Sequence, residues 1–298
     1  MEITRPAPLA AGSLLPAILL LLGAVSVIPV MDGIAKILAW TYPVVQVTWG
    51  RYFFNLLFIL PFVLWRYGPG ALSVPHRPLQ ILRGLFLVVS TFFFFLTLSF
   101  LPVADTLALV FLYPLLVTLA SPFFLGERVG WRRLMAVAVG FAGALLIIRP
   151  GTSMFQPAAF WGCLAGATVA GYLVLTRRLA GTAPAPVSLA FAALVGAVAL
   201  SLIVPFSWRP PTAGDWLLML SMGAIAALCH LGFIMAYERA PASILAPLGY
   251  AEMPSAVLVG FLFFGDLPDG WTWAGIVVIV GSGLFVVWRE KRAASGTA

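Results

Sequence analysis

The sequence predicts an all-α integral membrane protein in which ten transmembrane helices form two inverted five-helix repeats around a central cavity. Three observations support this fold class: an extreme composition, ten apolar runs long enough to cross a bilayer, and a repeat between the two halves. Of the 298 residues, 62% are hydrophobic and 9% are charged, and the mean hydropathy is +1.06. Soluble domains contain roughly 25% charged residues, so this chain has too little charge to cover a water-facing surface.

Each predicted helix is an apolar run close to the length that crosses a hydrocarbon core of roughly 30 Å, which is about 20 residues. The runs cover residues 14–31, 44–64, 84–101, 106–126, 134–148, 157–176, 184–206, 216–237, 240–265 and 271–288. The fifth run is short, but Arg133 and Arg149 bracket it. The break after Arg149 divides the chain into residues 1–151 and 152–298, and the short connections predict one membrane domain without a soluble part.

The basic residues predict the orientation of the chain, because cytoplasmic loops carry an excess of Lys and Arg. With a cytoplasmic N-terminus, thirteen of the 17 basic residues fall inside, including Arg83 in the connection before the third run. Three fall outside, namely Lys36, Arg149 and Arg209, and Arg51 lies within a helix. We therefore expect a multi-pass protein of a bacterial-type inner membrane, with both termini in the cytoplasm and the lipid bilayer as its surroundings.

Several other classes of protein are disfavoured. The net charge of +7 does not indicate a nucleic-acid partner, because the basic residues lie in short loops between apolar runs. The sequence lacks a phosphate-binding loop, an HExxH motif and a GxSxG motif. Cys163 and Cys229 both fall inside predicted spans, which disfavours a disulfide framework and a metal site. We expect no cofactor, no metal, no enzyme activity and no cleaved signal peptide, and a monomer is the simplest assembly.

The two halves of the chain resemble each other at an offset of about 140 residues. Residues 104–143 match residues 242–283, and the equivalences include prolines and a tryptophan as well as apolar positions. The matched pairs are Pro102 with Pro241, Pro114 with Pro254, Gly126-Glu127 with Gly265-Asp266, and Trp131 with Trp271. Because five helices is an odd number, the halves are expected to lie upside-down relative to each other. Inverted repeats are typical of secondary transporters, which bind their solutes near the bilayer midplane between the repeats.

Two of these segments resemble the drug/metabolite transporter superfamily, and in particular the EamA-type ten-helix exporters. They read LPVADTLALVFLYPLL and PASILAPLGYAEMPSAVLVG. The shared pattern is a Pro-Ala start to the fourth and ninth helices, a proline within each, and a Gly-Glu after each. The chain departs from it at Asp266, which replaces the usual Glu, and at Glu252-Met253-Pro254, where the family often has Glu-Pro. Within the family the sequence is most similar to amino-acid exporters of the YddG type.

The resemblance implies a secondary transporter that exports small organic solutes, in particular amino acids including aromatic and neutral ones. Transport would proceed by alternating access between the two repeats. Export of drugs or other metabolites is the first alternative. A membrane-embedded lipid-modifying enzyme is a more distant one, because the sequence shows no nucleophile–base pair for it. A structural scaffold would not need ionisable residues at the midplane.

Glu252 is the sharpest candidate for a site residue, because it lies near the middle of a run that has no other charge. Ionisable groups inside a membrane generally face a partner or a wet cavity. Tyr250 and Pro254 flank it, and Tyr113 and Pro114 are the corresponding residues of the first half. Glu252 would recognise a substrate amine or couple transport to protons; the alternative is a structural hydrogen bond to a neighbouring helix.

Further candidates lie in the first two helices. Asp32 and Lys36 are four residues apart, so an ion pair within the helix is the plain expectation, and substrate binding or gating by Asp32 is the alternative. Arg51 could bind a substrate carboxylate through two hydrogen bonds, with Asn55 on the same helix face and Trp49 in an aromatic pocket. Alternatively, Arg51 pairs with Asp32, or its side chain extends outward to the membrane–water interface.

The remaining candidates are a histidine and three prolines. His230 in the eighth helix is either a proton-sensitive cavity residue or a neutral, hydrogen-bonded one. Pro29, Pro114 and Pro254 are candidate hinges, because proline removes a helical hydrogen bond. The run from Thr91 to Phe95 is expected to pack against lipid and core instead of binding a ligand.

Overall fold

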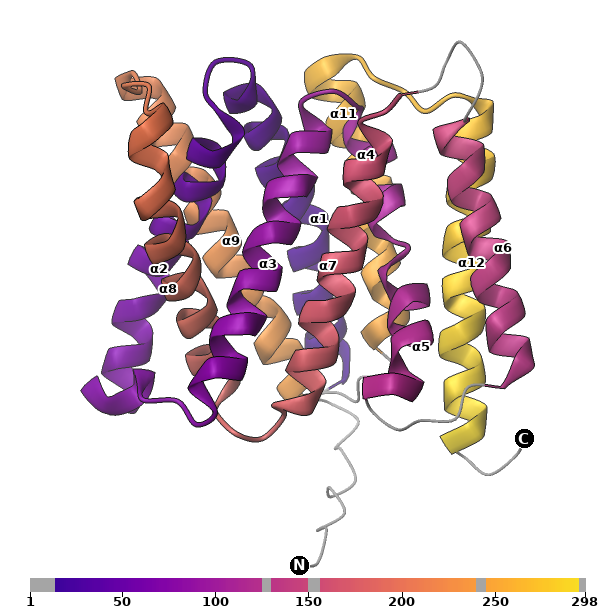
Figure 1. Ribbon diagram of the computed structural model, residues 1–298, viewed down its shortest axis with the longest axis horizontal. Coiled ribbons are helices and arrows are strands. Elements are labelled where there is room, and N and C mark those ends of the chain that lie inside the picture. Colours follow the sequence, from indigo (N-terminus) through magenta and orange to yellow (C-terminus); the bar gives the residue numbers. More distant parts are fainter. Residues whose placement is uncertain (1–13, 125–129, 150–155, 240–244, 295–298) are drawn as a thin grey trace, which may run out of the picture.

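The computed structural model describes residues 14–124, 130–149, 156–239 and 245–294. Over these residues the chain is helical throughout, and no strand occurs in them (Figure 1). Seven helical segments are long and apolar enough to cross a membrane, and three shorter apolar helices bring the total to ten. The all-α ten-helix fold predicted from the sequence is confirmed.

The first half begins with three long helices and continues with a divided fourth segment. Its elements are α1 (Leu14–Ala39), α2 (Val44–Tyr67), η2 (Pro69–Leu72), α3 (Arg77–Leu98), α4 (Val103–Val110), α5 (Tyr113–Phe124) and α6 (Trp131–Ile148). The second half follows the same plan. Its elements are α7 (Ala159–Arg178), α8 (Ala185–Ile203), η3 (Val204–Ser207), α9 (Ala213–Arg239), η4 (Ala246–Ala251), α11 (Glu252–Phe264) and α12 (Gly270–Ala294).

The helices extend beyond the apolar runs, because helix ends continue into polar residues at the membrane boundary. This changes the position of Arg83, which the sequence placed in a loop. In the structure α3 begins at Arg77, so Arg83 lies within the helix and is only 4% exposed. The other two expected inside residues of this connection, Arg66 and Arg77, are exposed.

The fourth and ninth crossings are each interrupted. α4 ends at Val110, and the chain turns at Phe111 and Leu112 before α5 begins. In the ninth crossing the 3-10 segment η4 precedes α11. Pro114 and Pro254 therefore lie in the first turn of α5 and α11, not in the middle of a continuous helix. In a first turn, the N–H that proline lacks would have no helical acceptor, so no helical hydrogen bond is lost. Pro29, in contrast, lies inside the continuous helix α1.

The two halves run in opposite directions through the bundle. In Figure 1, α1 starts at the lower edge and runs upward, whereas α7, the first helix of the second half, runs downward. α12 ends at the same lower edge at which α1 begins. The closest packing joins helices of different halves: α1 with α9, α3 with α7, α6 with α12, and α2 with both α9 and α8. The first two pairs are equivalent under an internal two-fold relation, because each joins the first helix of one half to the third helix of the other.

Close packing between the halves depends on small residues, as is typical of membrane helices. Gly166 of α7 faces the break after α4, and a Cβ atom at this position would lie 3.0 Å from the carbonyl oxygen of Val110. The backbones of α7 and α4 therefore meet without an intervening side chain. This contact holds the end of α4 in place beside the cavity described below.

Polar contacts join the helix ends at the upper edge of Figure 1. Lys36 donates hydrogen bonds to the Asp266 carboxylate at 2.9 Å and to the Leu101 carbonyl at 3.1 Å. Arg149 donates to a carboxylate oxygen of Asp269 at 2.6 Å. Tyr42 donates to Asp215 at 2.6 Å. These contacts tie α1, the α1–α2 connection and the end of α6 to segments of the second half.

Candidate functional site

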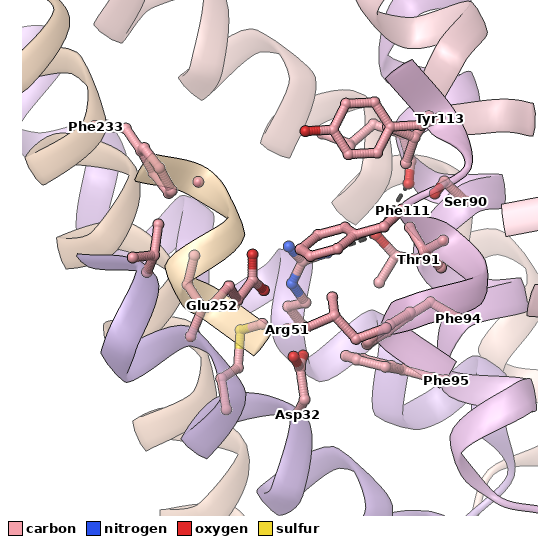
Figure 2. Close-up of a pocket in the computed structure, with 18 of the residues that line it drawn as sticks. Asp32, Arg51, Ser90, Thr91, Phe94, Phe95, Phe111, Tyr113, Phe233 and Glu252 are labelled. Carbon is pink, nitrogen blue, oxygen red and sulfur yellow. Dashed lines mark hydrogen bonds between the residues drawn. The ribbon is translucent and has the colours of Figure 1, made fainter. Parts of the chain in front are cut away.

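A cavity of about 320 Å³ lies between the two halves, close to both interrupted crossings (Figure 2). α1, α2, α3, α4, α7 and α9 contribute to its wall, together with the junction of η4 and α11. Three of the lining side chains are charged: Asp32, Arg51 and Glu252. The aromatic lining residues are Phe94, Phe95, Phe111, Tyr113 and Phe233. We call this space the central cavity.

The interruption of the ninth crossing positions Glu252. This residue is the first of α11, and Gly249 in the preceding 3-10 segment also lines the cavity. The carboxyl points into the cavity toward the Arg51 side chain in Figure 2. Within the part of the chain that the structure describes, Glu252 makes no hydrogen bond and no ion pair. The expected alternative, a structural hydrogen bond to a neighbouring helix, is not found among these residues.

Arg51 is held in the cavity by its neighbours on α2 and α3. Its Nη1 donates a hydrogen bond of 2.5 Å to Thr91 Oγ1, and the Tyr52 hydroxyl shares a hydrogen bond of 3.0 Å with the same oxygen. The guanidinium carbon lies 6.0 Å from the centre of the Phe95 ring, within the range of a cation–π contact. The Nε atom is buried without a hydrogen-bond partner. Arg51 therefore keeps donor capacity for a ligand and does not extend toward the interface.

Asp32 does not form the ion pair with Lys36 that the sequence suggested. It is 3% exposed, lines the central cavity, and points toward Arg51 in Figure 2. Lys36 is one helical turn away but turns to Asp266 instead, at 2.9 Å. The reason is tertiary: α11 and the connection to α12 pack against α1 and present the Asp266 carboxylate at the upper edge.

The central cavity thus combines two carboxyl groups, one guanidinium and an aromatic wall. Charges in a low-dielectric interior are expensive unless each has a counter-charge. One guanidinium can balance only one of the two carboxylates. The arrangement can bind a solute that brings a positive group for Asp32 or Glu252 and a carboxylate for Arg51, with its apolar part against the phenylalanines.

The part of α3 beginning at Thr91 was expected to pack against lipid and core, and this interpretation was incomplete. Thr91, Phe94 and Phe95 all line the central cavity. They occupy positions i, i+3 and i+4 of a helix and therefore share one face. That spacing could have identified them from the sequence, whereas Phe233 had no comparable signal.

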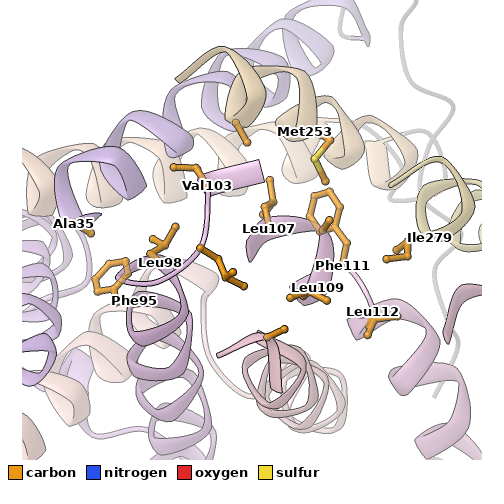
Figure 3. Packing of buried hydrophobic residues seen from close by; sticks show 14 of the residues in the cluster. Ala35, Phe95, Leu98, Val103, Leu107, Leu109, Phe111, Leu112, Met253 and Ile279 are labelled. Atoms are coloured by element: carbon orange, nitrogen blue, oxygen red, sulfur yellow. The ribbon is translucent and has the colours of Figure 1, made fainter. Parts of the chain in front are cut away.

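Hydrophobic packing fixes the wall of the cavity around the first interruption. Phe111 is 5% exposed and lies among Leu107, Leu109 and Met253 in the largest buried cluster (Figure 3). This cluster joins residues of α1, α3, α4 and α11. The interrupted backbone at Phe111 is therefore embedded in protein, where irregular membrane segments are tolerated.

Four candidate binding residues from the sequence lie outside the central cavity: Tyr250, Asn55, Trp49 and His230. Tyr250 is one layer behind it, with its ring edge-on to Phe111 at 5.2 Å and its hydroxyl buried without a hydrogen-bond partner. Asn55 is buried on α2, and its Oδ1 atom also lacks a partner. Trp49 donates to Ser201 at 2.8 Å and stacks on Phe53, so it belongs to the α2–α8 contact. Tyr113 does line the cavity, next to the candidate hinge Pro114.

His230 lines a second cavity of about 720 Å³, which we call the lower cavity because it adjoins the α7–α8 connection at the lower edge. Its Nδ1 lies 2.6 Å from the Ala226 carbonyl oxygen. A carbonyl only accepts hydrogen bonds, so Nδ1 carries a hydrogen and donates to it. Phe233 lines both cavities and forms part of the wall between them.

Comparison with known proteins agrees with this architecture. The model of the EamA-like transporter family matches the chain twice, over residues 15–149 and 156–288. An S-adenosylmethionine uptake transporter of Rickettsia bellii is 28% identical over 89% of this chain and 90% of its own length. A riboflavin transporter of Brucella anthropi is 30% identical over 86% of this chain and 92% of its own length.

A solved crystal structure has the same fold. The two chains superpose over 94% of this chain and 99% of the other, with a TM-score of 0.60 and 21% sequence identity. The narrower resemblance to YddG-type amino-acid exporters finds no support in the names of these two relatives, which specify other solutes.

Proposed function

This chain belongs to the EamA-like transporter family, and we propose that it is a secondary transporter for small zwitterionic solutes of the amino-acid type. The observation that carries the proposal is the charge pattern of the central cavity: Asp32 and Glu252 face Arg51 within an aromatic wall. An α-amino acid presents an ammonium and a carboxylate on one carbon atom. Both groups would meet their complement in this cavity, and an aromatic or neutral side chain would contact Phe94, Phe95 and Phe111.

The chemistry of each charged side chain supports a distinct role. Arg51 is suited to the substrate carboxylate, because a guanidinium forms two parallel hydrogen bonds to a carboxylate. Glu252 and Asp32 accept from an ammonium. The three ionised side chains together carry a net charge of −1, and a zwitterion adds no net charge. A proton or a cation would therefore have to accompany the carrier both when it is empty and when it holds an amino acid.

Alternating access would use the features that distinguish the two edges. The contacts of Lys36 with Asp266 and of Arg149 with Asp269 join the two halves at the upper edge and would hold it closed, while the lower cavity adjoins the opposite edge. We propose that the interruptions at residues 111–112 and 246–251, with Pro114 and Pro254 beside them, let the half-helices tilt. Pro29 would allow α1 to bend next to Asp32. The upper contacts would open as the lower edge closes.

A second candidate substrate is S-adenosylmethionine. It carries a sulfonium in addition to the ammonium and carboxylate, so its net positive charge would balance both carboxyls of the cavity. The relative in Rickettsia bellii bears this name. Riboflavin, named for the relative in Brucella anthropi, carries neither an ammonium nor a carboxylate and would leave all three charged residues without a role.

The direction of transport is part of the proposal. The resemblance to exporters implies net export, with both termini in the cytoplasm and the lower cavity on the cytoplasmic side. The relative in Rickettsia bellii is named an uptake transporter, so direction has to be measured. Sided accumulation in inverted and right-side-out membrane vesicles separates export from uptake.

The decisive experiment is transport by the purified protein in proteoliposomes. Labelled threonine, methionine, phenylalanine, S-adenosylmethionine and riboflavin are offered one at a time, with and without a pH gradient. We expect saturable uptake of at least one amino acid or of S-adenosylmethionine, competed by the others of this class. Transport of riboflavin alone, or of none of the five above empty liposomes, would contradict the proposed substrate class.

A further inference from the structure

The lower cavity contains a buried cation that the central cavity does not use. Arg83 of α3 lines it and is only 4% exposed. Tyr172 and Thr176 of α7, Ser188 of α8, and His230 of α9 surround the same space. Helices of both halves form the walls of this space.

The surroundings of Arg83 supply hydrogen-bond acceptors but no negative charge. Its Nη2 donates a 2.7 Å hydrogen bond to the Ser188 carbonyl, and its guanidinium carbon lies 6.0 Å from the centre of the Tyr172 ring. Its Nε atom is buried without a partner. None of the described residues that line the lower cavity is Asp or Glu.

This environment differs from that of the other buried cations. Lys36 pairs with Asp266, and Arg51 faces Asp32 and Glu252. A buried charge without a counter-charge is strongly destabilising, and a donor left without an acceptor adds to the cost. The lower cavity is roomy enough, at about 720 Å³, for the missing anionic group to come from a ligand.

We propose that the lower cavity is a second solute-binding site, in which Arg83 binds the carboxylate of the transported solute on its way to or from the central cavity. This inference rests on the proposed transport of amino-acid-type solutes. Phe233 lines both sites, so a solute that passes this ring exchanges Arg83 for Arg51 as the partner of its carboxylate. In the neutral ring of His230, Nε2 would accept from the ammonium, since the hydrogen is on Nδ1, which donates to Ala226.

The test compares a solute with its carboxamide in phosphatidylcholine proteoliposomes. The solute is the best transported of threonine, methionine and phenylalanine, and the variants are R83Q, R83K and R77Q. Arg77 is the matched control, because it lies on the same helix but is exposed and its side chain bonds to Ser73. We expect R83Q to raise the KM of the amino acid about tenfold, as loss of a charge-assisted hydrogen bond should. The KM of the carboxamide should change less than about twofold.

R83K should give an intermediate KM because it keeps the charge but loses the two-point geometry, and R77Q should match the wild type. An R83Q variant that alters both KM values equally, or neither, would overturn the inference while leaving the proposed function intact. A wild-type protein that transports no amino acid would overturn both.

Anionic lipid is the other source of an oxyanion. If added phosphatidylglycerol raises the thermal midpoint of the wild type but not of R83Q, and the two KM values do not separate, Arg83 binds a lipid phosphate and the inference fails.

Discussion

Lys36 on α1 donates to the carboxylate of Asp266, 2.9 Å away and 230 positions along the chain, although Asp32 lies one turn away on its own helix. The contact ties the first helix of one half to the end of the ninth crossing in the other half. It also leaves the Asp32 carboxyl to face the central cavity. One tertiary contact thus both joins the two halves at the upper edge and completes the charge pattern of the candidate site.

The contact between Lys36 and Asp266 should control opening of the upper edge. In a background with the free thiols Cys163 and Cys229 replaced by alanine, Ser90→Cys places a reporter thiol in the central cavity. Lys36→Met should increase the labelling rate of this thiol by an impermeant reagent applied from the upper side, severalfold for a pair worth about 1 kcal/mol. The exchange Lys36→Asp with Asp266→Lys should restore the slower rate. Equal labelling in all three proteins would show that this contact does not hold the edge closed.

Glu252→Gln should abolish most transport without unfolding the protein. The carboxyl makes no hydrogen bond or ion pair among the described residues, so its removal costs the fold little or stabilises it. Loss of the ammonium acceptor should lower kcat/KM for the amino acid by about tenfold or more. The measurement is initial uptake in proteoliposomes, with thermal unfolding of the same preparation as the control. A variant that unfolds more easily but transports normally would indicate a structural role.

Arg51→Lys should impair carboxylate recognition, because a lysine cannot make two parallel hydrogen bonds. We expect KM for the amino acid to rise about tenfold while KM for its carboxamide changes little. Thr91→Val, which preserves shape but removes the oxygen that accepts from Arg51 Nη1, should raise KM by roughly fivefold, since a typical hydrogen bond contributes about 1 kcal/mol. Uniform loss of maximal rate with both solutes would argue against this role for Arg51.

Asp269 makes the upper edge sensitive to strong acid. The hydrogen bonds from the Arg149 side chain and the Thr272 N–H lower the pKa of this carboxyl from 3.8 to about 2. A lowered pKa means that the stabilisation is complete above pH 3.8 and disappears as pH falls through about 2. Asp269 is half-exposed, so screening limits its contribution to about 0.2–1 kcal/mol. The thermal midpoints of wild type and Asp269→Asn should differ slightly at pH 6. They should converge as the pH approaches the pKa of Asp269 in the folded protein.

Gly166→Val should destabilise the bundle. A Cβ at this position would lie 3.0 Å from the Val110 carbonyl oxygen, and backbone atoms cannot yield without separating α7 from α4. Overpacking of this kind typically costs about 1–3 kcal/mol. Gly23→Ala is the matched control on α1, because no atom lies within 4 Å of its added Cβ. It should be neutral or more stable by about 0.5–1 kcal/mol. The comparison requires reversible unfolding in detergent, and a Gly166→Val protein as stable as wild type would contradict the contact.

The sequence by itself determined the class of fold. Ten apolar runs can satisfy their backbone hydrogen bonds in lipid only as helices. Each half contains five of these helices, and this odd number implies that the two halves are inverted relative to each other. It also identified Asp32, Arg51 and Glu252, because a charge in an apolar run stands out wherever the helix lies. The aromatic spacing from Thr91 to Phe95 was readable too, as one helix face.

Tertiary structure alone decided which of these residues meet. Local spacing favours Asp32 with Lys36, but packing of the ninth crossing on α1 offers Lys36 a different carboxylate. Trp49 and Asn55 are on the same helix as Arg51 yet lie outside the cavity. Trp49 contacts α8, whereas Asn55 shares the face of Arg51 but lies one turn further along the helix. Arg83 looked like a loop residue until α3 was seen to begin at Arg77. Sequence patterns encode which residues share a face; only the packed helices determine what that face touches.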